Sequence, residues 1–446
     1  MNIAPFNFTP ARSALVSLAL FSSTVISHAD TPPQWNSIPP GIPAYGATQT
    51  ELKLAGKPVA TVQLSEPTVV SVATKPEGWG FFQFPKITRI NDQTLYVRWS
   101  MSHDNIKSYG KKGGGGAVSR DNGKTWELAE TPPAGPPGGL LLPNGDRLSV
   151  ESPVALKVED LKMPKPIGES IQNWSGTKRY FYLASEMPTE RQGVYFKRLP
   201  AGQTEAVSEH ATVDDAKAVK YSLEGLVPVM WSGRMHVAAD GSIIGGIYPS
   251  YRLRDDGSLD PKIGVGFYRS TDGGRVWKLH GRIPYQFDAK ADAKGAGREG
   301  FTEPNFEILA DGTYLCILRT SDVGNGPMYF STSRDQGVTW TTPKAFTQSG
   351  VLPQLLQLKN GVVVLTSGRP GVQLRFNVDG IGTNWTEPLE FFDYAHADLH
   401  TSCGYTSLLE TGPDRFLMVY SDFLFKNQAG EIRKAIKVRE IIVIPK

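Results

Sequence analysis

Short apolar runs separated by two-residue polar turns recur six times along the chain, with roughly 50 to 95 residues between successive turns. Most of these turns are Asn-Gly or Asp-Gly, which between apolar runs is the strongest short-range signal for a β-hairpin, because both residues adopt positive φ. The six turns are Asn91-Asp92, Asn144-Gly145, Asp240-Gly241, Asp311-Gly312, Asn360-Gly361 and Thr411-Gly412. We therefore predict six copies of one β unit.

Repeated β units bury their faces by packing against one another, and closing them into a ring also protects the strand edges. We predict an all-β fold, a six-bladed β-propeller, over residues 75–446. No stretch shows a sustained helical period, so we expect little helix. The longest interval, between Gly145 and Gly241, predicts an insertion, whose middle (155–220) is charged and rich in proline.

The first 29 residues predict a cleavable signal peptide for export. Arg12 precedes an apolar run (14–26), and small residues lead to Ala29, near which we expect cleavage. The run is shorter than the ~20 residues of a membrane span, and no other stretch is long and apolar enough for one. We expect the mature protein in the periplasm or outside the cell, with a lead-in over residues 30–74 that packs on the outside of the fold.

Composition excludes several classes of protein. Hydrophobic residues make up 40% of the 446 residues, and 47 basic residues nearly balance 44 acidic ones, which is not the profile of a disordered chain. A net charge of +3 gives no reason to expect nucleic acid as a partner. Two cysteines cannot form a disulfide scaffold or a four-thiolate zinc site. Export permits a Cys316–Cys403 disulfide, although the apolar, strand-like segment around each thiol favours two buried free cysteines.

A second repeat lies within the first. The pattern Ser-x-Asp-x-Gly-x-Thr/Val-Trp occurs at Ser119–Trp126, Ser270–Trp277 and Ser333–Trp340, with a weaker copy at Asn377–Trp385. Its residues suit a tight turn: the Asp carboxylate accepts backbone N–H groups, the Gly adopts positive φ, and the Trp buries a large apolar surface. The role that this chemistry predicts is structural.

This element resembles the Asp box of the sialidase (neuraminidase) superfamily, also known as the BNR repeat. The resemblance extends over roughly residues 75–445. It implies a six-bladed propeller with its site at the central axis, the same fold that the hairpins predict.

Residues at a fixed distance from each hairpin turn are expected to cluster around the axis of a propeller. Counting seven to nine residues upstream of the turns gives Gln83, Gly138, Arg234, Glu303, Pro353 and Tyr405. Counting seven to eight residues beyond the turns, on the returning strands, gives Tyr248, Arg319 and Arg369. A phenol, a carboxylate and several guanidinium groups in one funnel indicate a chemical site, while the alternative is a set of polar side chains at an open, solvated axis.

The segment from Glu303 to Arg319 resembles the Glu-to-Arg segment of sialidases, and Tyr405, in Gly-Tyr-Thr-Ser, is similar to their nucleophilic tyrosine. The resemblance implies that Tyr405 attacks the anomeric carbon and that Glu303 takes its proton. A phenol with a pKa of ~10 needs such a base at neutral pH. Sialidases use tyrosine in place of the usual second carboxylate and retain configuration.

Arg319 and Arg369 resemble two of the three arginines that hold the substrate carboxylate in sialidases, with Arg375 as a competitor for the second place. Guanidinium suits this task because its planar fork pairs bidentately with a carboxylate. Asp104 lies between the first hairpin and the first Asp box, where the family keeps its general acid on a loop. An exposed loop aspartate without a catalytic role is the alternative for this position.

The first arginine of the family is replaced. Sialidases carry it in a Tyr/Phe-Arg-Ile-Pro segment, and the corresponding residues here are Phe82-Gln83-Phe84-Pro85. Gln83 cannot supply the missing charge, although Arg234 lies at the equivalent depth of the third unit. The loss of one guanidinium should weaken carboxylate binding and leaves other acidic sugars open as substrates.

These residues support three hypotheses. The first is a secreted, sialidase-like exo-glycosidase that acts with retention on a terminal acidic sugar of a glycan or glycoconjugate. The second is a polysaccharide lyase acting on uronic-acid-containing glycans, for which Arg234, His236, Tyr248 and Arg252, with His103 as a further base, supply the needed residue types. The third is a non-catalytic glycan-binding propeller. No cofactor is expected, because no residues have metal-ligand spacing, while a bound calcium ion and the oligomeric state stay open.

Overall fold

The structure is a computed structural model that describes residues 47–111, 113–129, 131, 133, 138–173, 175–320, 326–369, 371–390 and 404–446. The predicted signal peptide and Cys403 lie outside these residues, so the alternatives for the two cysteines stay predictions. The described part of the chain is all β, as predicted, and contains no α-helix. Its helical turns are short 3₁₀ segments: Ile106–Ser108, Val158–Asp160, Ala184–Glu186, Thr189–Arg191 and Gly295–Gly297. None of the described helices is long and apolar enough to cross a membrane.

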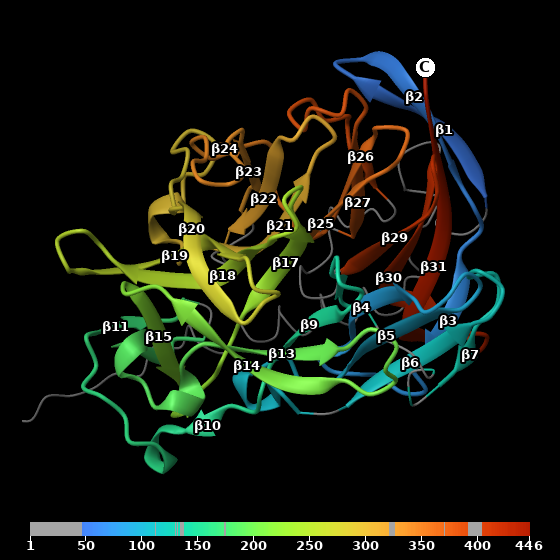
Figure 1. Cartoon of the computed structure of the whole chain (residues 1–446). Helices are drawn as coiled ribbons and strands as arrows, with labels where there is room; N and C mark the ends of the chain where they lie inside the picture. Colours follow the sequence, from blue (N-terminus) through green and yellow to red (C-terminus); the bar gives the residue numbers. More distant parts are fainter. Residues whose placement is uncertain are drawn as a thin grey trace, which may run out of the picture.

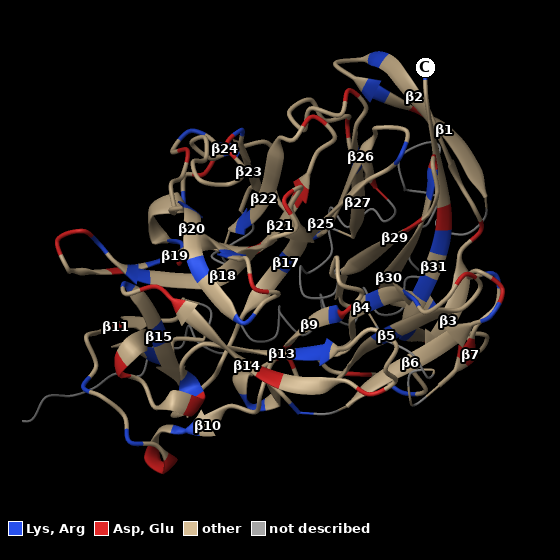
Figure 2. Cartoon of the chain, in the orientation of Figure 1, with Lys and Arg blue, Asp and Glu red and all other residues tan. Residues whose placement is uncertain are grey.

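The sheets stand side by side around a central axis, in the arrangement of a β-propeller (Figure 1). Within the described residues the strand pairing divides into six units, which fits the predicted six blades, and five of the six predicted turns join the first two strands of their units. In the last unit the predicted pair Thr411-Gly412 is the end of the first strand, Thr406–Gly412, and the turn is Pro413-Asp414. Lys and Arg are interspersed with Asp and Glu around the ring (Figure 2). This mixture agrees with the nearly balanced composition.

Three of the units are separate four-stranded antiparallel sheets. The first consists of β4 (Phe81–Arg89), β5 (Leu95–Met101), β6 (Gly114–Ser119) and β7 (Glu127–Leu128). The fourth consists of β21 (Phe301–Ile308), β22 (Tyr314–Thr320), β23 (Tyr329–Ser333) and β24 (Lys344–Ala345). The fifth consists of β25 (Val351–Gln357), β26 (Val363–Gly368), β27 (Val372–Asn377) and β28 (Leu389–Glu390).

The second and third units are joined, because their outer strands pair in parallel. The second unit consists of β8 (Leu140–Leu141), β9 (Arg147–Glu151), β13 (Val194–Leu199) and β14 (Val207–Asp214). The third consists of β17 (Ser232–Val237), β18 (Ile243–Leu253), β19 (Leu259–Ser270) and β20 (Val276–Ile283). The parallel contact is between β14 and β20.

The insertion predicted between Gly145 and Gly241 is present and forms a small additional sheet attached to β18 through β15. Part of the predicted 155–220 stretch, however, supplies β13 and β14 of the second unit. The strands of the additional sheet are β10 (Leu156–Lys157), β11 (Gly168–Ile171), β12 (Lys178–Leu183), β15 (Ala218–Leu223) and β16 (Leu226–Val227). We call these five strands the insertion sheet.

The ring is closed by both ends of the described chain, seen in blue and red in Figure 1. Strands β29 (Thr406–Gly412), β30 (Arg415–Lys426) and β31 (Ile432–Pro445) pair in order, and β31 then pairs with β3 (Thr68–Val72) and β2 (Lys57–Leu64), to which β1 (Thr48–Leu54) is added. Residues 48–72, which the sequence assigns to an outer lead-in, are therefore part of the last sheet. Ala60, Val62 and Leu64 are buried in its core, which gives the physical reason.

The repeated turn makes the same hydrogen bonds in its three strong copies. The Asp Oδ1 accepts the Ser hydroxyl at 2.7 Å in each, the Ser Oγ accepts the Gly N–H, and the Trp Nε1 donates to the Gly carbonyl. Hydrogen bonds from Thr125 lower the pKa of Asp121 to about 2. Trp277 is completely buried between the second and third units. The Gly of each turn lies against a leucine or isoleucine of the preceding unit, so these turns connect neighbouring units.

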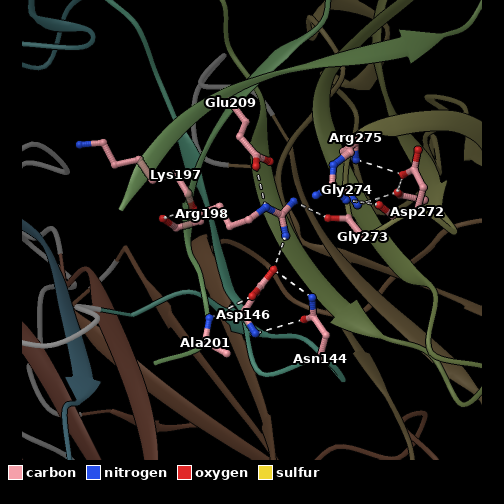
Figure 3. Close-up of polar contacts among 12 residues, drawn as sticks. Asn144, Asp146, Lys197, Arg198, Ala201, Glu209, Asp272, Gly273, Gly274 and Arg275 are labelled. Carbon is pink, nitrogen blue, oxygen red and sulfur yellow. Dashed lines mark hydrogen bonds and ion pairs between the residues drawn. The ribbon is translucent and has the colours of Figure 1, made fainter. Parts of the chain in front are cut away.

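Figure 3 shows a buried arginine at the seam between the second and third units. Arg198 on β13 is 3% exposed and donates to Glu209 Oε1 at 2.8 Å, to Asp146 Oδ2 at 3.2 Å and to the carbonyl of Gly273 at 2.6 Å. Asp146 follows the predicted hairpin turn of the second unit, and Gly273 belongs to the repeated turn of the third. The two sequence repeats thus meet in one charge-assisted network.

Candidate active site

The first strands of three units share one irregularity, which shapes the centre of the ring. The strand register shifts between Gln83 and Lys86, between Thr302 and Asn305, and between Val351 and Gln354. At each shift a residue with positive φ precedes a proline: Phe84 (φ 52), Glu303 (φ 46) and Leu352 (φ 44). Non-glycine residues adopt this conformation rarely, and such local strain concentrates at functional sites. All three of these residues line one cavity.

This cavity, which we call the central cavity, has a volume of about 1170 Å³, and residues from all six units contribute to its wall. Six residues predicted for the site line it: Asp104, Tyr248, Glu303, Arg319, Arg369 and Tyr405. The residues predicted from the sequence thus bring together two phenols, a glutamate carboxylate, two guanidinium groups and a loop aspartate.

Glu303 and Arg319 form an ion pair inside the central cavity. Arg319 Nη1 lies 2.6 Å from Glu303 Oε2, and the two side chains are 7% and 13% exposed. The same carboxylate oxygen accepts the backbone N–H of Leu352 at 2.8 Å. The neighbouring strands β21 and β22 place the pair, since Thr302 is opposite Arg319 in the register. The carboxylate is thus fixed in position with a cation beside it.

Tyr405 lies at the start of the last unit with its hydroxyl beside a second cation. Arg369 Nη2 donates to the Tyr405 hydroxyl at 3.4 Å, and Tyr405 is only 2% exposed. Its ring stacks on Phe84, with ring centroids 4.4 Å apart. Arg369 also lies over the ring of Trp79 at 5.3 Å. A guanidinium group at this place favours negative charge on the phenol oxygen.

Asp104 is carried by the loop after β5, at the mouth of the central cavity. Its Oδ2 accepts the indole N–H of Trp79 at 3.2 Å. Although the residue is exposed, desolvation at the mouth raises the pKa of its carboxyl, and the negative charge of Glu303 adds to this shift. The hydrogen bond from Trp79 and the charges of Arg319 and Arg369 act in the opposite direction. A carboxyl that keeps its proton to higher pH is suited to act as an acid.

Four predicted site residues lie outside the lining of the central cavity. Gln83 is completely buried, and its Oε1 accepts the backbone N–H of Gly80. Arg375 lies on β27, the third strand of the fifth unit, where it donates to Gln373 Oε1 at 2.9 Å. Burial lowers the pKa of Arg375 to about 10. Neither Gln83 nor Arg375 lines the central cavity, so neither is placed to contact a substrate there as predicted.

The other two are Arg234 and His236, which lie nearer the hairpin turns. Arg234 is 3.0 Å from Glu307 and also donates to Asn305 and to the carbonyl of Leu355. His236 lies 3.4 Å from Glu307 and 2.9 Å from the carbonyl of Phe306, and burial lowers its pKa. Their polar groups bind neighbouring blades instead of facing the central cavity.

Of the residues considered for a lyase, Tyr248 and His103 line the cavity. Arg252 is paired with Asp215 outside it. Burial, followed by the charge of Glu303, raises the pKa of Tyr248 well above its usual value. The part of the chain that the structure describes holds no group of three His, Cys, Asp or Glu residues suited to a metal ion.

Sequence reasoning missed several residues of the cavity wall, among them Trp79, Phe84, Tyr109 and Tyr221. Phe84 could have been predicted from a different alignment of the first turn. In the fourth unit, Leu309 N donates to Thr313 O and Gly312 is the residue before Thr313. In the first unit, Ile90 N donates to Thr94 O in the same way, so Gln93 is the residue that corresponds to that glycine. Counted from there, Phe84 and not Gln83 corresponds to Glu303, and both precede proline.

No protein-family model and no curated protein matches this chain. Among solved structures, a protein of unknown function from Dyadobacter fermentans is 18% identical over 84% of this chain and 99% of its own, with a TM-score of 0.52. An alpha-L-arabinanase from Penicillium chrysogenum is 15% identical over 84% and 98%, with a TM-score of 0.44. The Hadza microbial sialidase Hz136 is 15% identical over 79% and 65%, with a TM-score of 0.42. The first likeness is one of fold, and the chemistry has to be argued from the site itself.

Proposed function

We propose that the protein is an exo-acting glycoside hydrolase that removes a terminal acidic sugar with retention of configuration, as sialidases do. The observation that carries the proposal is the Tyr405 hydroxyl 3.4 Å from the guanidinium of Arg369, in the cavity that Glu303, Arg319 and Asp104 also line. A nucleophile, a base, an acid and two cations are the groups that this reaction needs.

In the first step the Tyr405 oxygen attacks the anomeric carbon and its proton passes to Glu303. The glycosidic bond breaks at the same time, and Asp104 gives its proton to the leaving oxygen. In the second step the Asp104 carboxylate takes a proton from water, which attacks the anomeric carbon and breaks its bond to Tyr405. The phenol oxygen recovers its proton from Glu303, and the site returns to its starting state.

Two guanidinium groups support an acidic substrate. Arg319 and Arg369 line the cavity next to the proposed base and nucleophile, and a planar fork pairs bidentately with a carboxylate. The proposal assigns no substrate contact to Gln83, which lies outside the cavity lining. The predicted signal peptide is consistent with an exported enzyme, and export is part of the proposal.

Incubation with methylumbelliferyl sialoside and, separately, with a uronate polysaccharide tests the proposal. We expect release of the free acidic sugar, with the anomer of the substrate appearing first in proton NMR because two inversions give retention. Release of the opposite anomer, or an unsaturated uronate product, would overturn it in favour of an inverting or a lyase mechanism. Binding of both glycans without any product would leave only the glycan-binding function.

A further inference from the structure

The insertion sheet forms a second wall of the central cavity, which the proposed catalytic residues also line. Arg179, Tyr221, Leu223 and Glu224 come from β12, β15 and the turn after β15, and Gln172 precedes β12. The sheet comes from two inserted segments: β10 to β12 lie in the chain between β9 and β13 of the second blade, and β15 and β16 lie between the second and third blades. This wall is therefore an addition to the ring.

The second wall is held rigidly against the ring by a buried ion pair. Arg179 is 4% exposed and lies 3.0 Å from Glu299, and its guanidinium carbon is 5.5 Å from the ring centroids of both Tyr221 and Tyr251. Glu299 also accepts the backbone N–H of Asn173. A preorganised wall of this kind binds a ligand without first losing conformational entropy.

The chemistry of the second wall suits hydroxyl groups. Burial raises the pKa of Tyr221 to about 12, and it also raises the pKa of Tyr109, which lies near both Tyr221 and Asp104. Both phenols therefore stay neutral at physiological pH and can donate and accept hydrogen bonds. The Tyr221 hydroxyl is 3.7 Å from the sulfur of Met230, a weak acceptor that a sugar hydroxyl would readily replace.

Charge separates the two halves of the cavity. Near the proposed nucleophile, Arg319 and Arg369 supply two guanidinium groups, of which Arg319 is paired with Glu303. On the second wall, Arg179 is paired with Glu299, and Glu224 is paired with Lys107 of the Asp104 loop at 3.4 Å. An acidic group is favoured in the first half and a neutral one in the second.

The size of the cavity agrees with two occupants. Its 1170 Å³ exceeds the range of about 300–1,000 Å³ that is usual for sites of single small ligands. The loop that carries Asp104 contacts the second wall, because Lys107 pairs with Glu224 at 3.4 Å. The proposed acid, which protonates the oxygen between the two sugars, is therefore carried by a loop that also contacts the second wall.

We infer that the insertion sheet supplies a subsite for a neutral sugar on the leaving-group side, with Tyr221 as a specificity-determining residue. The inference rests on the proposed function and names its substrate class: an acidic terminal sugar linked to a neutral one. The subsite binds the neutral unit through phenol hydroxyls and aromatic faces.

The test compares sialyllactose, which has a neutral leaving group, with methylumbelliferyl sialoside, whose leaving group is not a sugar. In Tyr221→Phe we expect kcat/KM for sialyllactose to fall about three- to tenfold more than kcat/KM for the aryl sialoside, as for the loss of one hydrogen bond. Tyr180→Phe is the matched control: this tyrosine lies on β12 of the same sheet, is 38% exposed, and lies outside the cavity lining. The control should leave both values unchanged.

Calorimetry with sialyllactose and with free sialic acid gives a readout that needs no turnover. We expect wild type to bind sialyllactose more tightly, and Tyr221→Phe to weaken that binding about three- to tenfold more than binding of the free acid. If wild type shows this preference but hydrolyses neither sialoside, the proposed function fails and the subsite stands. Equal effects of Tyr221→Phe on both ligands, no preference in wild type, or no binding of either glycan would overturn the subsite.

Discussion

Two levels along the axis of the ring each contain a Glu–Arg pair, but the two pairs have different surroundings. At the cavity level, Glu303 pairs with Arg319 at 2.6 Å on the wall of the central cavity. At the turn-side level, four residues further along β21, Glu307 pairs with Arg234 at 3.0 Å and with His236 at 3.4 Å. Both levels therefore hold a carboxylate beside a guanidinium group.

The difference lies in what else these groups contact. Arg234 reaches across three blades, from β17 to Asn305 on β21 and the carbonyl of Leu355 on β25, so its charge joins neighbouring sheets. The cavity-level groups face a volume that a substrate can fill. A charged residue near the axis of a propeller is thus structural or functional according to its depth, and mutations at the two levels should have opposite signatures.

The largest effect is expected for the proposed nucleophile at the cavity level. In Tyr405→Phe we expect kcat/KM for a sialoside to fall by about 10⁴-fold, because no oxygen is left to attack the anomeric carbon. Tyr248→Phe, a second phenol of the cavity, is the control and should lose less than tenfold. Steady-state kinetics, with thermal unfolding to verify the fold, provide the measurement, and full activity of Tyr405→Phe would end the proposed mechanism.

Asp104→Asn should give the next largest effect, a loss of about 10² in kcat for sialyllactose and a smaller loss for an aryl sialoside, whose leaving group needs less protonation. The pH profile supplies a second readout. The acid form exists below the pKa of Asp104, which the cavity raises, so wild-type kcat should fall as pH rises through that pKa. This alkaline limb should be absent in Asp104→Asn; a limb that persists unchanged contradicts the role of acid.

Much of the fold follows from the local signal of the turns. Asn-Gly and Asp-Gly pairs mark the hairpins because glycine adopts positive φ without strain, as it does in each of these pairs, and each pair joins the first two strands of a unit. The Asn or Asp before the glycine does not have positive φ, so the expectation that both turn residues adopt it was wrong. The local sequence does not predict that residues 48–72 join the last sheet. Alternate residues of Lys57–Leu64 are buried, but which sheet this strand joins depends on Ile441 and Val443 at the other end of the chain.

Counting residues from the turns predicted the site correctly where the strands are regular. Arg319 and Tyr405 lie where their distance from a turn places them, whereas Gln83 is one residue from the position that lines the cavity. The bulge at each residue that precedes proline changes which side chain faces the axis, as Phe84 and Leu352 show. Counting from a turn also does not give the depth of a residue along the axis. It assigned Arg234 and Glu303 to the same level, although only Glu303 lines the cavity.

Mutations at the turn-side level should lower the stability of the protein and leave its activity unchanged. We expect Glu307→Gln to lower the free energy of unfolding by about 2 kcal/mol, because Arg234 then keeps its charge in a partly buried site without its carboxylate. Activity should stay within twofold of wild type. Glu127→Gln is the control, since its pair with Arg120 is exposed and should contribute less than about 1 kcal/mol. Urea unfolding gives both values, and a loss of kcat without loss of stability would contradict the division between the levels.

The smallest effect concerns the hydrogen bond that holds the proposed acid. Trp79 donates to Asp104 at 3.2 Å and thereby favours the charged carboxylate, so Trp79→Phe should raise the pKa of Asp104 further. The alkaline limb of kcat should move upward by less than about one pH unit, while the ring that faces Arg369 is kept. Trp126→Phe, in a repeated turn outside the cavity lining, should leave the limb in place. A downward movement, or no movement, in Trp79→Phe would mean that the alkaline limb does not report the carboxyl held by Trp79, and the cavity level would then lack its acid.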